Sequence, residues 1–270
     1  MSSKPSPASG PVRPRIEHLE SLERGLRVLA LFGIDGVHEF TMTDVAERLD
    51  ITRASAMRLL GTLERLDFIH ASGRSYRLGV RVLGLGYAYL SSLGFNTVAR
   101  PIVEALMQET GETCSIGVLD DGDVVYVVRV EARRIVRIDL SVGSRLPAYL
   151  NSMGRVLLAA MPDEDLQAYL AALKPIAVTR KTVTDKQELR KRILATRRTG
   201  WCYIDGEVEA RVAGLSVPLR GRDGRTMAAL NITLMSQARS RQEVEKKVLP
   251  KLADATRRIE QILHYGLPVR

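Results

Sequence analysis

The sequence of 270 residues has little of several things on which whole classes of protein depend. Two cysteines are too few for a secreted scaffold built from disulfides, so a reducing, cytoplasmic compartment is expected. The most apolar stretches, residues 82–93 and 156–161, are far shorter than the roughly 20 residues that a membrane span needs. Residues 1–15 have no apolar core, so no signal peptide is expected there. Because 45% of the residues are hydrophobic, disorder over most of the chain is excluded.

The residue groups that catalysis requires are also missing from the sequence pattern. Neither Cys114 nor Cys202 has a histidine nearby in the sequence, and no metal-ligand spacing is present. Both cysteines are therefore expected at buried apolar positions. Gly84 and Gly86 lack the third glycine of a dinucleotide site, and no phosphate-binding loop motif occurs. We therefore expect no catalytic residue, no metal and no cofactor.

What the sequence does have is an excess of basic residues. The 40 Lys and Arg against 31 Asp and Glu give a net charge of +9, which makes an anionic partner plausible. Residues 51–94 hold six basic and two acidic residues, so a local excess lies there. Residues 1–15 combine four prolines with basic residues and are expected to form a disordered basic tail.

Residues 16–79 show the order of elements of a winged helix-turn-helix domain. A first helix is predicted from residue 16 by one apolar stripe at spacings of three and four: Leu19, Leu22, Leu26, Leu29 and Ala30. A second helix is predicted over 43–49, with Thr43 as its N-cap, and a third over 53–67. Two short runs, 68–71 and 75–78, then predict a hairpin. Three helices followed by a hairpin are the layout of a winged helix-turn-helix.

The third helix would enter the major groove of double-stranded DNA as the recognition helix. Its outer face near its start offers five candidate contact residues: Thr52, Arg53, Ser55, Met57 and Arg58. Arginine can donate two hydrogen bonds to guanine O6 and N7 or hold a phosphate, and Ser and Thr can serve either contact. Arg74 and Arg77 of the hairpin lie where a wing would meet phosphates. The alternative is a solvated polar face on an ordinary three-helix domain.

Residues 96–270 have a different pattern, in which helices alternate with strand pairs. Helices are predicted over 100–110, 150–160, 163–172, 185–199 and 241–264. Hairpins are predicted from the runs 113–119 and 124–130 and from the runs 215–219 and 226–233, with a further strand over 134–140. This mixture predicts an α+β fold in which helices pack on an antiparallel sheet. The boundary between the two halves is expected near residues 94–96.

A series of ordered motifs runs through both halves of the chain. In the first half they are TDVAERL (43–49), SAMRLLGTL (55–63), YRLG (76–79) and LGLG (83–86). In the second half they are VGSRLPAY (142–149), SMGRVLLA (152–159), VPL (217–219) and AALNI (228–232). Together they cover about residues 18–265 and resemble the IclR family of bacterial transcriptional regulators. The stretch 144–149 is most similar to the branch that regulates the β-ketoadipate pathway, whose members respond to protocatechuate, 4-hydroxybenzoate or related acids.

The resemblance implies a winged helix-turn-helix over 16–79, a linker helix over 80–95, and a GAF-like effector-binding and oligomerisation domain over 96–270. It also implies homodimers, often paired into homotetramers, with dimer contacts through the DNA-binding domains. The apolar residues of the linker helix could face a second copy, and a core face within one chain is the alternative.

An effector pocket on one face of the sheet is also implied. The positions that match it are Ile138, Ser152, Met153, Asp205, Gly214, Asn231 and Thr233. Asn231 and Thr233 alternate to the same face of a strand, as a ligand-facing pair should. A carboxylate ligand would suit a bidentate arginine, for which the candidates are Arg137, Arg145 and Arg211. Many relatives have Gly followed by Arg and Cys or Ser where this chain has Arg211, Ala213 and Gly214, which leaves the anion-binding position open.

The sequence thus predicts a transcription factor that binds operator DNA and a small organic acid, and that controls catabolism of an aromatic or related acid. Two alternatives remain: a small-molecule enzyme domain fused to a DNA-binding module, and a DNA-binding protein without a ligand.

Overall fold

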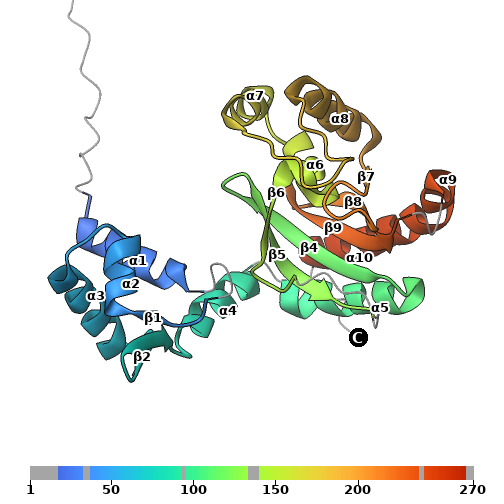
Figure 1. The fold of residues 1–270 in the computed structure, drawn as a ribbon. Coiled ribbons are helices and arrows are strands. Elements are labelled where there is room, and N and C mark those ends of the chain that lie inside the picture. The colour runs from blue at the N-terminus through green and yellow to red at the C-terminus, as the bar shows by residue number, and fades with distance from the viewer. Residues whose placement is uncertain (1–17, 33–36, 93–94, 133–139, 237–239, 266–270) are drawn as a thin grey trace, which may run out of the picture. The chain divides into compact units, whose positions relative to one another are not determined.

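A computed structural model of the chain describes residues 18–32, 37–92, 95–132, 140–236 and 240–265 (Figure 1). The chain divides into two compact units, Met1–Ala88 and Tyr89–Arg270. The predicted tail over 1–15 and nearly all of the strand predicted over 134–140 lie outside the described residues. Within the described part of the chain, no helix is long and apolar enough to cross a membrane.

The N-terminal unit has the predicted winged helix-turn-helix elements. Its helices are α1 (Glu20–Leu31), α2 (Met42–Arg48) and α3 (Arg53–Arg65), and its strands are β1 (Phe40–Thr41), β2 (Ile69–Ser72) and β3 (Ser75–Leu78). The strands form an antiparallel sheet in the order β1-β3-β2. The helices and the sheet share one apolar core, in which Val28, Val45 and Leu60 are completely buried. The β2–β3 pair is the predicted hairpin.

Two details of this unit differ from the prediction. Helix α2 begins after Thr41, not Thr43, because Thr41 and Asp44 form a capping box. The Thr41 hydroxyl accepts from the Asp44 amide at 3.2 Å, and the Asp44 carboxylate accepts from the Thr41 amide at 2.7 Å. Of the leucine stripe predicted for α1, only Leu29 packs against the core, whereas Leu19, Leu22 and Leu26 are more than half exposed.

Helix α4 (Val82–Ser92) follows strand β3, within the range predicted for the linker, and the division between the two units falls inside it. Its residues Leu83, Leu85 and Tyr87 are exposed. Leu90 packs against the core of the C-terminal unit.

The C-terminal unit is a six-stranded antiparallel sheet covered by helices on both faces, as the sequence predicts. The sheet order is β6-β5-β4-β9-β8-β7. Its strands are β4 (Thr113–Asp120), β5 (Asp123–Val130), β6 (Arg145–Pro147), β7 (Cys202–Asp205), β8 (Val212–Arg220) and β9 (Thr226–Met235). The short edge strands β6 and β7, of three and four residues, were not predicted.

Helices α5 (Arg100–Thr110) and α10 (Leu249–Tyr265) lie on one face of this sheet, and α6 (Ser152–Ala159), α7 (Asp163–Ala172) and α8 (Lys186–Thr199) lie on the other (Figure 1). Four short helical segments complete the unit: η2 (Phe95–Ala99), η3 (Ala148–Leu150), α9 (Arg241–Glu243) and η4 (Val244–Val248). Each face has its own apolar core. Leu230 and Ile232 of β9 belong to the core under α5 and α10, so the alternating residues Asn231 and Thr233 face the α6 side.

Helix α6 is buried along its whole length, and two contacts fix its start. The Asn151 side chain accepts a hydrogen bond from the Gly154 amide at 2.8 Å and so caps the helix. A Cβ added to Gly154 would lie 2.0 Å from the Ala148 carbonyl oxygen, so only glycine fits there. These contacts hold Ser152 and Met153 at the end of α6 that faces the sheet.

Candidate functional site

The candidate DNA-contacting residues lie on the start of α3 and on the β2–β3 hairpin. Arg53, Met57 and Arg58 are exposed on α3, and Arg74 and Arg77 are exposed on the hairpin. Within the described part of the chain, none of these four arginines pairs with a carboxylate. Their guanidinium groups are therefore available to an anionic partner.

The hydroxyl residues at the start of α3 serve the helix itself. Thr52 is the N-cap of α3, and its hydroxyl oxygen accepts a hydrogen bond from the Ser55 amide at 3.2 Å. Ser55 is half-buried. These two residues therefore fix where α3 begins, and the exposed arginines offer the stronger contacts to DNA.

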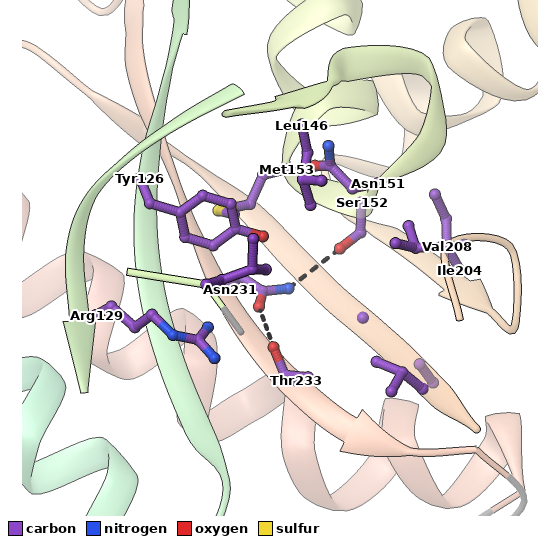
Figure 2. Close-up of a pocket in the computed structure, with 14 residues that line it drawn as sticks. Tyr126, Arg129, Leu146, Asn151, Ser152, Met153, Ile204, Val208, Asn231 and Thr233 are labelled. Carbon is purple, nitrogen blue, oxygen red and sulfur yellow. Dashed lines mark hydrogen bonds between the residues drawn. The ribbon is translucent and has the colours of Figure 1, made fainter. Parts of the chain in front are cut away.

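In the C-terminal unit, a hollow that is partly open to solvent lies between the start of α6 and the sheet (Figure 2). Five of the seven predicted effector-binding residues line it: Ser152, Met153, Gly214, Asn231 and Thr233. Asp205 does not line it, because its neighbour Ile204 is the residue of β7 that faces the hollow. The Asp205 carboxylate instead accepts a hydrogen bond from Lys181 Nζ at 3.0 Å. Ile138 lies outside the described residues.

A buried polar cluster forms the floor of this hollow. Asn231 Nδ2 donates to Ser152 Oγ, to Ser216 Oγ and to the Leu215 carbonyl, each at 3.1 Å. Ser152 and Ser216 also share a hydrogen bond of 2.7 Å. The Thr233 hydroxyl donates to Asn231 Oδ1 at 2.9 Å (Figure 2). The members of the cluster thus bond to one another, and the second lone pair of Asn231 Oδ1 can accept a further hydrogen bond.

Gly214 makes the close packing of this cluster possible. A Cβ added at this position would lie 2.6 Å from Ser152 Oγ and 3.4 Å from Asn231 Nδ2. The serine hydroxyl would then have to rotate away. Gly214 therefore makes room for the contact between α6 and the sheet.

Two residues that the sequence did not suggest, Tyr126 and Arg129 of β5, also line the hollow, and both point toward it in Figure 2. Three positions apart on a regular strand, they would face opposite sides of the sheet. The register between β4 and β5 shifts, however: Gly117 pairs with Tyr126, Ile116 pairs with Val128, and one residue of β5 is left over. This β-bulge brings both side chains to one face.

Arg129 is the only charged residue among the described residues that line the hollow. Its side chain is 8% exposed, and its guanidinium lies 5.9 Å from the centre of the Tyr126 ring. Nε donates to Glu131 at 3.1 Å, and Nη1 lies 3.4 Å from Ser115 Oγ. Burial raises the pKa of Tyr126 to about 12, so its hydroxyl remains protonated and can donate. The hollow therefore combines one cation, one phenol and an amide floor.

Two of the three arginines that the sequence suggested for a carboxylate, Arg145 and Arg211, do not line the hollow. Arg145 Nη1 donates to Asp120 at 2.7 Å and its Nε to Asp123 at 3.2 Å, which fastens β6 to the β4–β5 hairpin. Arg211 is exposed beside Glu209. Arg137 lies outside the described residues.

A buried ion pair anchors the segment that closes one side of the hollow. Arg155 of α6 donates from Nη1 and Nη2 to the Glu207 carboxylate, at 3.1 and 2.6 Å. The same carboxylate accepts from Arg192 at 3.2 Å. Val208, the next residue after Glu207, lines the hollow, and so does Val212. The ion pair therefore holds part of the wall in place.

The two cysteines are buried, as predicted, and burial raises the pKa of Cys114 to about 12. Among the described residues, no three His, Cys, Asp or Glu side chains are grouped so that they could hold a metal ion.

Two family profiles match the chain. The profile described as IclR helix-turn-helix domain matches residues 21–73, and that described as bacterial transcriptional regulator IclR C-terminal matches residues 87–261. The chain is 37% identical over 242 residues to the Pca regulon regulatory protein of Pseudomonas putida. The aligned region covers 89% of this chain and 83% of that protein. The chain is 30% identical over 252 residues to the p-hydroxybenzoate hydroxylase transcriptional activator of Acinetobacter baylyi, covering 92% and 93%. An IclR homolog from Microbacterium hydrocarbonoxydans, solved with 4-hydroxybenzoate, matches with a TM-score of 0.80 and 28% identity, covering 90% and 99%.

Proposed function

Because the chain belongs to the IclR family of bacterial transcriptional regulators, we propose that it binds operator DNA and responds to an aromatic hydroxy acid whose catabolism it controls. The observation that carries the proposal is the hollow under α6, in which a single buried arginine faces an amide and hydroxyl floor. The relatives named above regulate the Pca regulon and p-hydroxybenzoate hydroxylase, which supports the choice of ligand class. The protein then acts on DNA in the cytoplasm and catalyses no reaction.

In the proposed complex, the ligand carboxylate accepts charge-assisted hydrogen bonds from Arg129. The aromatic ring of the ligand lies among Tyr126, Met153 and Leu146, which line the hollow together with Arg129 and the polar floor. Its hydroxyl donates to Asn231 Oδ1, which already accepts from Thr233. Ser152 and Gly214 contribute by holding Asn231 in place.

On the DNA side, α3 enters the major groove and the β2–β3 hairpin contacts the phosphate backbone. The exposed arginines of both elements provide the positive charge.

The exposed apolar residues of α1 and α4 bind a second copy of the chain. Leu19, the N-cap of α1, and Leu22 and Leu26 within the helix are spaced by three and four and are all exposed, so they form one apolar stripe. On α4, Leu83 and Tyr87 are likewise exposed, four residues apart. Sedimentation velocity on the full chain tests this: Leu22→Glu is expected to yield monomers without loss of fold, and an unchanged oligomer would refute the assignment.

The ligand proposal is tested by thermal shift and calorimetry on the full chain with 4-hydroxybenzoate, protocatechuate, benzoate, β-ketoadipate and small keto acids. A hydroxybenzoate is expected to raise the melting temperature and bind reversibly. Arg129→Gln is expected to weaken its binding by about 10- to 150-fold, from the roughly 1.5–3 kcal/mol of a hydrogen bond to a charged group. Arg211→Gln, which removes an exposed arginine outside the hollow, is the matched control and should change nothing.

Three results would refute this proposal. A chain that no acid stabilises would be a DNA-binding protein without such a ligand. Turnover of the acid would identify an enzyme fused to a DNA-binding module. If the wild type and Arg129→Gln bound the acid with equal affinity, Arg129 would not be part of the binding site.

A further inference from the structure

Arg58 lies at the middle of the exposed face of α3. The helix buries three residues in the core of the N-terminal unit: Ala56, Leu60 and Leu63. Because successive residues are rotated by about 100°, the face opposite this core is formed by Ala54, Arg58 and Gly61 and, at the last position of the helix, by Arg65. All four are exposed. This is the face of the helix that points away from the protein.

Arg58 is flanked on this face by residues with almost no side chain. Ala54 lies one turn before it and Gly61 one turn after it. A Cβ added to Gly61 would meet nothing within 4 Å, so no protein packing requires glycine there. Small residues on both sides allow the helix to approach the floor of a groove, and Arg58 is then the long side chain in its centre.

Three other hydrogen-bonding side chains of α3, those of Thr62, Arg65 and Arg53, are either bonded within the helix or lie away from its centre. The Thr62 hydroxyl donates to the Arg58 carbonyl at 2.7 Å, so it cannot donate to a base. Arg65 lies about 10 Å further along the helix axis, at the far end. Arg53 is the first residue of the helix and lies at the flank between the core and the exposed face. Arg58 is the donor that remains at the centre.

We propose that Arg58 determines the base sequence of the operator by donating two hydrogen bonds to O6 and N7 of a guanine. Ala54 and the 60%-exposed Met57 offer apolar groups beside it, which contact thymine methyls, so T·A pairs adjoin this guanine. This inference rests on the proposed function, because it assumes that α3 lies in the major groove.

The remaining exposed arginines, Arg53, Arg74 and Arg77, hold phosphates in this arrangement. Phosphate contacts set the register of a protein on DNA but carry no base information. The three arginines therefore contribute to affinity at every sequence alike.

Selection of the full-length protein on a pool of random double-stranded DNA tests the assignment. The wild type is expected to enrich sites with a guanine next to thymines and to discriminate against the other bases at that pair by about 5- to 150-fold. Arg58→Gln is expected to change the preference at that one pair from G·C to A·T, because glutamine suits the adenine N6 and N7 pattern. Its affinity for random DNA should stay near that of the wild type.

Arg53→Gln and Arg74→Gln are the matched controls. Both are expected to enrich the wild-type site, to bind every sequence more weakly, and to reduce the slope of log affinity against log salt by about 1. All the substituted residues are exposed, and a melting curve for each variant confirms that it remains folded.

The possible outcomes separate the inference from the proposed function. A wild type that enriches no sequence refutes DNA recognition itself. An Arg58→Gln variant that still prefers guanine, or that loses affinity for random DNA as well, overturns the assignment while DNA binding stands. If Arg53→Gln lost the guanine preference and Arg58→Gln kept it, Arg53 would be the residue that reads the guanine.

Discussion

Replacing Glu207 by alanine is expected to destabilise the C-terminal unit by about 3–5 kcal/mol, because it leaves the guanidinium of Arg155 buried without a counter-charge. The Arg155 side chain is only 3% exposed and makes two hydrogen bonds to the Glu207 carboxylate. Arg192 donates to the same carboxylate, but its side chain is 45% exposed. Arg192→Ala is therefore expected to cost at most about 1 kcal/mol. One carboxylate thus has two arginine partners whose different burial predicts different contributions.

Urea unfolding followed by tryptophan fluorescence measures both effects. Trp201 is the only tryptophan of the chain and lies in the C-terminal unit, so its fluorescence follows that unit. With a slope of about 2 kcal/mol/M, Glu207→Ala should lower the midpoint by about 1.5–2.5 M and Arg192→Ala by less than about 0.5 M. A double variant, Arg155→Met with Glu207→Leu, removes both buried charges and is expected to recover most of the loss.

Similar losses in Glu207→Ala and Arg192→Ala would refute this reasoning, because burial would then not decide the contribution of an ion pair here. A double variant as unstable as the sum of its single variants would contradict the pairing itself. The same variants connect stability to function: Val208 follows Glu207 in the wall of the hollow, so Glu207→Ala should also weaken binding of the acid.

Three further predictions concern other parts of the chain. Gly214→Ala is expected to weaken acid binding in calorimetry while the chain remains folded, because the added Cβ would lie 2.6 Å from Ser152 Oγ; unchanged affinity would show that the polar floor does not contact the ligand. Thr41→Ala is expected to lower the protection of the α2 amides in hydrogen exchange by about 0.5–2 kcal/mol, whereas Thr43→Ala should be close to neutral, and the reverse order would restore Thr43 as the cap. Both cysteines should react with a thiol reagent only on unfolding, since burial raises the pKa of Cys114 to about 12; fast labelling of the native protein would contradict this.

Much of the N-terminal unit could be predicted because its elements are local. Apolar residues at helical spacing and a short turn between two strands identify three helices and a hairpin without any long-range information. The orientation of α1 could not be predicted in the same way. Periodicity shows that a helix has an apolar stripe, but Leu19, Leu22 and Leu26 form a stripe that the core does not use.

The effector hollow was predictable only where the strand pattern is regular. Asn231 and Thr233 follow from alternation along β9. Arg129 does not, because the β-bulge between β4 and β5 reverses the alternation just before it. The Arg155–Glu207 pair joins residues 52 positions apart and has no local signal in the sequence. These are the contacts that only the folded chain brings together.

Control of transcription by the proposed acid requires that binding of the acid in the hollow change the affinity of the recognition helix for the operator. The most direct test measures the affinity of the full-length protein for its selected operator with and without a saturating hydroxybenzoate. The predicted result is a change of about 5- to 150-fold in the dissociation constant, corresponding to a coupling free energy of about 1–3 kcal/mol, and no change in Arg129→Gln at the same acid concentration. Identical operator affinity with and without bound acid in the wild type would contradict the claim.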